Sequence, residues 1–155
     1  MAETPNLDIQ AAHAYFAKHC FNKTWEIIDM PERSQSDEDE MLQCCLTSLW
    51  HWKQREDCTF TNLSVGYWQA SRVFALLRQA VNARHYAELS LDFASKEGVE
   101  PFYRGYAHEA LARAEMVAGN VTAMEEHRAQ AQQIASLLTN SEEKQQLIQD
   151  LSSIQ

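Results

Sequence analysis

The chain of 155 residues is poor in turn-forming residues, with only four glycines and three prolines. A β-sandwich or a β-barrel needs such residues every ~8–12 positions, and this sequence does not supply them. A doubly wound nucleotide-binding fold requires a glycine-rich loop, and no two of the four glycines lie close together. Apolar residues make up 45% of the chain and charged residues 23%, as in ordinary globular proteins. We therefore expect an all-α protein.

Positive charge is also scarce. The sequence has 13 lysines and arginines against 22 aspartates and glutamates, which gives a formal net charge of −9. Nucleic-acid binding depends on clustered cations that neutralise phosphates, and no such cluster occurs. An anionic membrane surface is disfavoured for the same reason. We expect neither nucleic acid nor membrane as a partner, and the acidity steers basic partners weakly.

Long apolar runs are absent, because no stretch approaches the ~20 residues that span a bilayer. The start of the sequence lacks the basic and apolar regions of a signal peptide. Cys44 and Cys45 are adjacent and would point about 100° apart on a helix, so they cannot chelate one ion. With Cys20 and Cys58 they fit a reducing compartment, as small buried apolar groups. The sequence therefore predicts a cytoplasmic protein without a metal or a cofactor.

Apolar residues recur at spacings of three and four almost throughout, which is typical of helices. Pro31 ends the early helical segments, and a capping box of Ser36 with Asp39 is expected to open the helix that follows. Asn22 or Thr24 is expected to cap a short helix of its own. The predicted helices cover residues 7–20, a short segment from 22 or 24 that stops before Pro31, then 37–54, a helix from Asn62 or Ser64 to 79, and 82–96, 101–117, 121–138 and 140–154.

Four further signals mark where the later helices end or begin. Gly98 is expected as the left-handed residue that ends one helix, with Pro101 starting the next. Gly119 is expected to end that helix, and Asn140 to cap the last one together with Glu143. Short connections between helices predict antiparallel helical hairpins stacked in sequence.

A weak internal repeat with a period of about 37 residues relates the two later hairpins. Phe74 and Ala75 then correspond to Leu111 and Ala112, and Asn82 corresponds to Gly119. Small residues let the paired helices approach closely, while larger ones fill the space between successive hairpins. The small residues are Ala75, Ala87, Ala94, Ala112 and Ala131.

This pattern over residues 67–138 resembles the tetratricopeptide repeat superfamily. The resemblance implies a right-handed superhelix of about seven or eight helices, in one domain of residues 1–155. Residues 1–54 would form degenerate hairpins, 62–138 two weak repeats, and 140–155 a capping helix. The usual aromatic residue and glycine of a repeat's first helix are replaced by Ser71 and Ala75, and then by His108 and Ala112.

The whole length also resembles a group of small bacterial proteins with a tetratricopeptide-like fold and no assigned activity. That resemblance strengthens the expected fold and implies no reaction. The phrases that carry it are Phe21-Asn22-Lys23-Thr24-Trp25, Trp50-His51-Trp52, Trp68-Gln69-Ala70-Ser71-Arg72-Val73 and the run from Tyr106 to Ala114.

A polar stripe lies on the first helices of the predicted hairpins. Tyr106, Glu109 and Arg113 are spaced three and four apart, so they share one helix face. Gln69 and Arg72 would fall on the equivalent side of the preceding hairpin, with Trp68 and Tyr103 nearby. Two guanidiniums, a carboxylate and a tyrosine could hold a carboxylate or phosphate. The alternative is a structural ion-pair network of Glu109 with Arg113 or Arg72.

The phrase Trp50-His51-Trp52 places two indoles about 200° apart on a helix, so both cannot serve one face. We expect one of them in the core and the other at a groove or interface. His51 could act as a proton carrier or as a metal ligand. The alternative is a histidine that is hydrogen-bonded to a neighbouring loop. Trp25 and Trp68 are expected mainly in the core.

No catalytic motif stands out. His108-Glu109 begins like a zinc-protease helix, but Ala112 takes the place of the second histidine. The expected function is a non-enzymatic scaffold that binds a protein segment or a second copy of itself through a concave face. The alternative is a protein that binds a small anionic ligand in a pocket around Arg72, Tyr106, Glu109 and Arg113. An enclosed pocket of ~300–1,000 Å³ would favour the small ligand, and an open groove the peptide.

Overall fold

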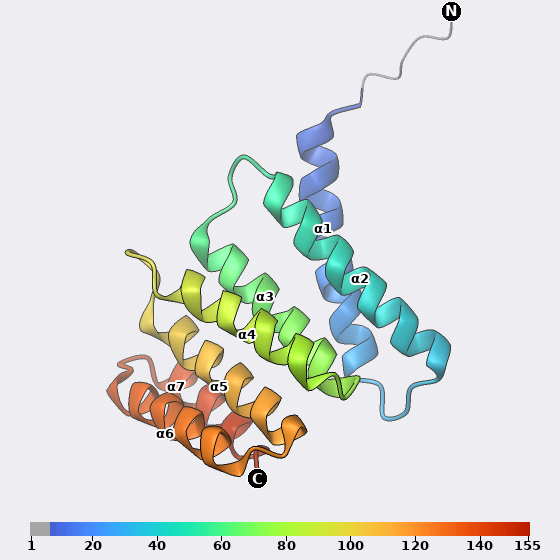
Figure 1. Ribbon diagram of the computed structural model, residues 1–155. Helices are drawn as coiled ribbons and strands as arrows, with labels where there is room; N and C mark the ends of the chain where they lie inside the picture. Colours follow the sequence, from blue (N-terminus) through green and yellow to red (C-terminus); the bar gives the residue numbers. More distant parts are fainter. Residues whose placement is uncertain (1–6) are drawn as a thin grey trace, which may run out of the picture. The chain divides into compact units, whose positions relative to one another are not determined.

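The computed structural model describes residues 7–155 (Figure 1), and this part of the chain contains seven helices and no strand, which confirms the all-α class. It divides into two compact units, residues 7–58 and 59–155. The division falls where the sequence pattern breaks, between residues 56 and 62. The helices are α1 (Ile9–Ile28), α2 (Gln35–Gln54), α3 (Phe60–Leu76), α4 (Ala80–Ala94), α5 (Pro101–Ala118), α6 (Val121–Leu137) and α7 (Ser141–Leu151).

The first unit consists of α1 packed against α2. Each helix buries residues spaced three and four apart, which gives a single apolar stripe per helix. The Ser48 hydroxyl on α2 donates a hydrogen bond to the carbonyl of Ala17 on α1, 2.7 Å away, where the two backbones approach closely. The buried residues are Ala17, Cys20, Thr24 and Ile27 on α1, and Met41, Cys45, Ser48 and Leu49 on α2.

The expected break near Asn22 and Thr24 is wrong, because α1 runs without interruption to Ile28. Thr24 is buried, and its hydroxyl donates to the carbonyl of Cys20 one turn earlier at 2.8 Å. A threonine that bonds in this way is satisfied within the helix and does not need to cap a new one. The eight predicted helices are therefore seven in the described chain.

The capping box of α2 forms at Ser34 and Asp37, two residues before the predicted pair Ser36 and Asp39. The sequence contains the same serine-to-aspartate spacing twice in this loop, so the pattern alone does not choose between them. A second box, Thr59 with Asn62, starts α3 and places Asn62 inside the helix that it was expected to open.

Helix α5 is the centre of the second unit. It packs against α3, α4, α6 and α7, and Figure 1 shows it between α4 and α6. All eleven residues from Gly105 to Glu115 are buried. A helix that is buried all round belongs to the interior of a domain, so every polar residue on this stretch must find its partners within the protein.

The paired helices of the second unit repeat with a spacing of 41 residues, not about 37. Helices α3 and α5 begin at Phe60 and Pro101 (101 − 60 = 41), and α4 and α6 begin at Ala80 and Val121 (121 − 80 = 41). The expected turn at Asn82 is wrong, because the left-handed position is Arg78, with φ of 58°. Gly119 occupies the equivalent position with φ of 74°, so its predicted role is confirmed.

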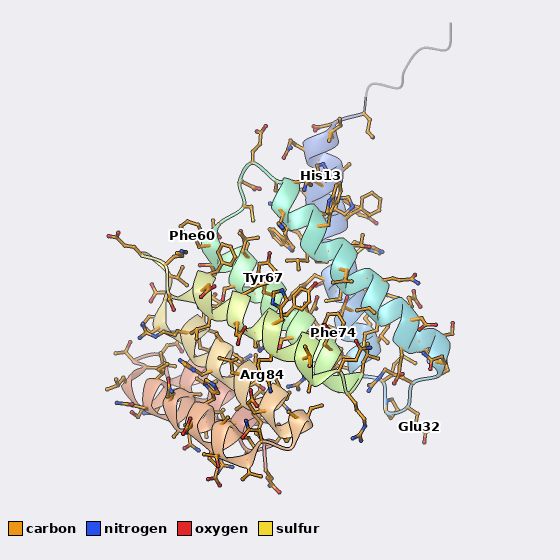
Figure 2. All side chains as sticks on the ribbon, viewed as in Figure 1. His13, Glu32, Phe60, Tyr67, Phe74 and Arg84 are labelled. Atoms are coloured by element: carbon orange, nitrogen blue, oxygen red, sulfur yellow. The ribbon has the colours of Figure 1, made fainter. Side chains whose placement is uncertain are left out.

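Aromatic rings join α3 to α4. Tyr67 and Phe74, labelled in Figure 2, lie seven residues apart on α3, and both pack on Tyr86 of α4, with centroid distances of 6.0 and 5.2 Å. Tyr67 also stacks on Phe93 at 5.6 Å. In the next pair of helices, His108 and His127 take the places of Tyr67 and Tyr86, with ring centroids 5.5 Å apart.

Helix α7 packs against both α5 and α6. Asn140 caps it as predicted, accepting hydrogen bonds from the backbone of Glu142 and Glu143. Leu147 is fully buried and lies close to Gly105 of α5. A Cβ atom at that position would lie 2.6 Å from Leu147 Cδ2, so one of the two groups would have to shift. The last helix therefore contributes to the core of its unit.

Two other expectations are corrected. Helix α4 ends at Ala94 with Ser95 as its cap, so Gly98, although left-handed with φ of 84°, lies beyond the helix end. Of the four cysteines, Cys20 and Cys45 are buried as expected, while Cys44 and Cys58 are only partly buried. Burial raises the pKa of Cys45 to about 12, which keeps this thiol protonated.

Candidate functional site

Glu109 is the centre of a buried polar cluster between α3, α5 and α7. Its side chain is 1% exposed. Oε1 accepts hydrogen bonds from Arg72 Nη1 at 3.2 Å and from Arg113 Nε at 2.8 Å. Oε2 accepts from the indole Nε1 of Trp68 at 3.0 Å. Three of the residues that sequence spacing grouped with Glu109 therefore contact this one carboxylate.

Helix α7 completes this group, which we call the Glu109 cluster: Trp68, Arg72, Tyr106, Glu109, Arg113, Asp150 and Ser153. The Tyr106 hydroxyl donates to Asp150 Oδ2 at 2.6 Å. Arg113 Nη2 donates to Ser153 Oγ at 3.0 Å and to the Asp150 carbonyl at 3.3 Å. The cluster thus ties the C-terminal helix to the centre of its unit.

The charges of the cluster balance, since two guanidiniums face two carboxylates. Burial, and then the neighbouring charge of Arg113, lower the pKa of Arg72. Burial and the hydrogen bond to Asp150 raise the pKa of Tyr106, so the phenol stays protonated and keeps donating. Buried charges need partners of this kind. The contacts are those of an ion-pair network that the protein satisfies from its own side chains.

An apolar pocket of about 270 Å³ lies beside the cluster, and we call it the aromatic pocket. Helices α3, α4, α5 and α7 all contribute to its wall. Its lining residues are Ser64, Val65, Trp68, Ser90, Phe102, Tyr103, Tyr106 and Gln146.

Trp68 and Tyr106 belong to both features. Their polar atoms bind Glu109 and Asp150, while their rings line the aromatic pocket in an edge-to-face contact with centroids 5.2 Å apart. Phe102 meets Tyr106 edge to face as well, at 5.0 Å. The cluster fixes the orientation of two wall residues, because each of these rings is held at its polar end.

Two serines line the aromatic pocket where α3 packs against α4. Ser64 Oγ donates to the Ser90 carbonyl at 3.0 Å, and Ser90 Oγ donates to the Ser64 carbonyl at 2.9 Å. Both residues are buried. These two hydrogen bonds use the hydroxyl protons of both serines. Neither serine hydroxyl therefore has a proton left to donate to a group in the pocket.

Two of the other residues expected at the site lie in the same unit. Tyr103 lines the aromatic pocket and packs on Phe102. Gln69 is buried on α3, with 1% of its surface exposed, so it does not present a polar group to solvent. Trp68, expected mainly in the core, is partly buried and packs against the core of this unit, and it also forms part of the pocket wall.

His51 and Trp52 belong to the first unit. His51 Nδ1 lies 2.8 Å from Nδ1 of His13 on α1, so the expectation that it bonds a neighbouring loop is wrong. Burial and the charge of His13 lower the pKa of His51. Trp50 is exposed and Trp52 is partly buried under the Arg55 guanidinium, 4.2 Å from its ring centre. Neither indole lies in the core, contrary to the sequence expectation.

Sequence reasoning missed several residues that form the site. Asp150 and Ser153 complete the cluster, and Ser64, Val65, Ser90, Phe102 and Gln146 line the pocket. One signal was available for α7, because Leu147, Leu151 and Ile154 mark a buried face spaced by three and four residues. The pocket residues carry no comparable signal.

Comparison with protein-family models, with curated proteins and with solved structures finds no match for this chain. Among residues 7–155, no helix has both the length and the apolar character needed to cross a bilayer. The same residues contain no group of three or more histidine, cysteine, aspartate or glutamate side chains placed to hold a metal ion.

Proposed function

We propose that the protein is a non-enzymatic helical-repeat binding module, similar in architecture to a tetratricopeptide stack, that binds a protein segment. The observation that carries this proposal is the aromatic pocket, whose walls are held in place by the Glu109 cluster. In protein interfaces, most of the binding energy comes from a few side chains that fill well-formed pockets. The aromatic pocket would take such a side chain from the partner.

The 41-residue spacing supports the repeat architecture. At this spacing Arg72 is equivalent to Arg113, and the Tyr67–Tyr86 contact is equivalent to the His108–His127 contact. Each helix pair therefore places the same type of contact at the same position, as stacked helical hairpins do. The right-handed superhelix implied by the resemblance is part of this proposal.

The size and the chemistry of the pocket support a protein segment over a small ligand. A volume of about 270 Å³ is below the ~300–1,000 Å³ of ordinary small-molecule pockets. Arg72 and Arg113 both donate to Glu109, so an anionic ligand would have to compete with a buried carboxylate. Binding of the small anionic ligand predicted from the sequence is one of the outcomes that the experiment below distinguishes.

Selection from a displayed peptide library against the full chain tests the proposal. Selected peptides are expected to lose at least tenfold in affinity on Val65→Trp, which fills the aromatic pocket from its own wall. Val81→Trp is the matched control, because Val81 is 75% exposed and lies outside the pocket. Equal binding by both variants, or binding of phosphate or carboxylate metabolites in place of any peptide, would contradict the proposal.

An exposed aromatic face on α1 and α2 favours self-association as a second candidate. Tyr15, Phe16 and Trp50 are all exposed there; Trp50 contacts His13, Phe16 contacts His51, and Tyr15 packs on Phe16. Exposed apolar patches of this kind often mark interfaces. Sedimentation equilibrium of the full chain is expected to show a dimer that Trp50→Lys dissociates, and a monomer at all concentrations would refute this candidate.

A further inference from the structure

We propose that the group taken by the aromatic pocket is an uncharged aromatic side chain of the bound segment. This inference rests on the proposed binding function and specifies its chemistry. It follows from three properties of the pocket: which polar atoms are already bonded, how large the space is, and how the rings of the wall are oriented.

The buried polar atoms around the pocket are already bonded within the protein. Trp68 Nε1 donates to Glu109, and the Tyr106 hydroxyl donates to Asp150. The hydroxyls of Ser64 and Ser90 donate to each other's carbonyls. An anionic group entering this space would lose its hydration without gaining a counter-charge, which is strongly unfavourable. The group that enters therefore carries no negative charge.

The volume limits the group to about one ring system. A dry apolar cavity of about 150 Å³ is sufficient for benzene. The 270 Å³ of the aromatic pocket therefore has room for a substituted benzene ring or an indole. Gln146 is exposed and contributes to the wall, so its amide is available to the polar end of such a ring or to the backbone that carries it.

The orientation of the wall favours an aromatic group over an aliphatic one. Tyr106 meets Trp68 at an interplanar angle of 77° and Phe102 at 74°. Rings at nearly right angles offer both an electron-rich face and an electron-poor edge to an incoming group. A further ring gains from such a contact beyond the area that it buries, whereas an alkyl group gains only from the area.

NMR titrations of the full chain with small molecules test whether the aromatic pocket prefers an uncharged aromatic group. Indole and p-cresol are expected to bind saturably and to shift the indole N–H of Trp68. Isoamyl alcohol, an uncharged aliphatic probe, is expected to bind at least threefold more weakly, and benzoate at least tenfold more weakly. Equal binding of the alcohol and p-cresol, or preference for benzoate, would overturn the inference.

A conservative variant separates aromatic recognition from simple apolar burial. Phe102→Leu keeps an apolar wall but removes one ring, so p-cresol is expected to lose about threefold to tenfold in affinity, while isoamyl alcohol changes by less than twofold. Phe60→Leu is the control, because Phe60 packs on Phe93 outside the pocket and is half exposed. Equal losses for both probes would overturn the inference, and thermal melts verify that both variants are folded.

The inference and the proposed function can fail separately. If indole and p-cresol bind at Trp68 but no displayed peptide binds, the pocket chemistry is supported and the peptide-binding function is refuted. If selected peptides bind through an aliphatic or charged anchor that Val65→Trp blocks, the binding function is supported and the aromatic inference is overturned.

Discussion

Arg72 and Arg113 occupy equivalent positions of two helices, 41 residues apart (113 − 72), and both donate hydrogen bonds to the same oxygen, Oε1 of Glu109. Two like charges are thus brought together by one carboxylate in the interior of the second unit. This arrangement links helices α3 and α5 and makes Glu109 the residue on which the charge balance of the cluster depends.

The substitution Glu109→Gln should therefore destabilise the protein strongly. It preserves the shape of the side chain but takes the shared carboxylate away from the buried Arg113 guanidinium and the partly buried Arg72 guanidinium. Removing one partner of a buried ion pair costs about 3–5 kcal/mol, and the amide oxygen can retain part of the hydrogen bonding. We expect a loss of about 3 kcal/mol in the free energy of unfolding, measured by urea denaturation.

Glu125→Gln is the matched control, because Glu125 lies exposed on α6. Surface substitutions of this kind change stability by less than about 0.5 kcal/mol. If Glu109→Gln costs no more than Glu125→Gln, then Glu109 does not hold the two guanidiniums together in solution.

Gly105→Ala should push α7 away from α5. The added methyl would lie 2.6 Å from Leu147 Cδ2 and 3.3 Å from Ile134 Cγ2. Overpacking of this kind costs about 1–3 kcal/mol, partly offset by the better helix propensity of alanine. In a double-mutant cycle, Leu147→Val should recover part of the loss, whereas strictly additive effects would show that the two residues do not touch.

Arg78→Gly should stabilise the turn between α3 and α4. Arg78 has φ of 58° and is exposed, and a left-handed backbone disfavours residues that carry a Cβ atom. We expect a gain of about 0.5–1 kcal/mol and a higher melting temperature by calorimetry. Arg78→Ala keeps the Cβ atom and serves as the control, and a gain of equal size from alanine would show that backbone strain is not the cause.

Stability should fall in acid because of His108. Burial, with the charges of His127 and Arg104, lowers the pKa of His108 from 6.5 to about 4. Above pH 6.5 the histidine is neutral in both the folded and the unfolded chain, so its contribution is complete. As the pH falls from 6.5 to 4, only the unfolded chain takes up the proton, and up to about 3 kcal/mol is lost.

The variant His108→Gln isolates this contribution, since it retains a polar side chain facing His127 but does not titrate. Urea denaturation at several pH values between 7.5 and 4 should give a shallower loss of stability for the variant than for the parent. Parallel pH profiles would mean that other groups cause the acid sensitivity.

The sequence was sufficient to predict structural features that depend on the spacing of residues within a single helix. Tyr106, Glu109 and Arg113 share a face because they lie three and four residues apart, and the end of α5 at Gly119 follows from its left-handed preference. Contacts between distant segments were not predictable in this way. Asp150 meets Tyr106 only because α7 folds back onto α5, and the repeat register was hidden because Arg78 occupies a position where glycine is usual.

Asp150 follows the other charged residues of the Glu109 cluster in the sequence, and this order has a consequence for biosynthesis. The ribosome releases Arg72, Glu109 and Arg113 before the second carboxylate of the cluster has been made, so the emerging chain carries an excess of positive charge at the place that later becomes its interior. A chain that stops before α7 therefore cannot complete this interior, which stays unfinished until Asp150 and Ser153 have been translated.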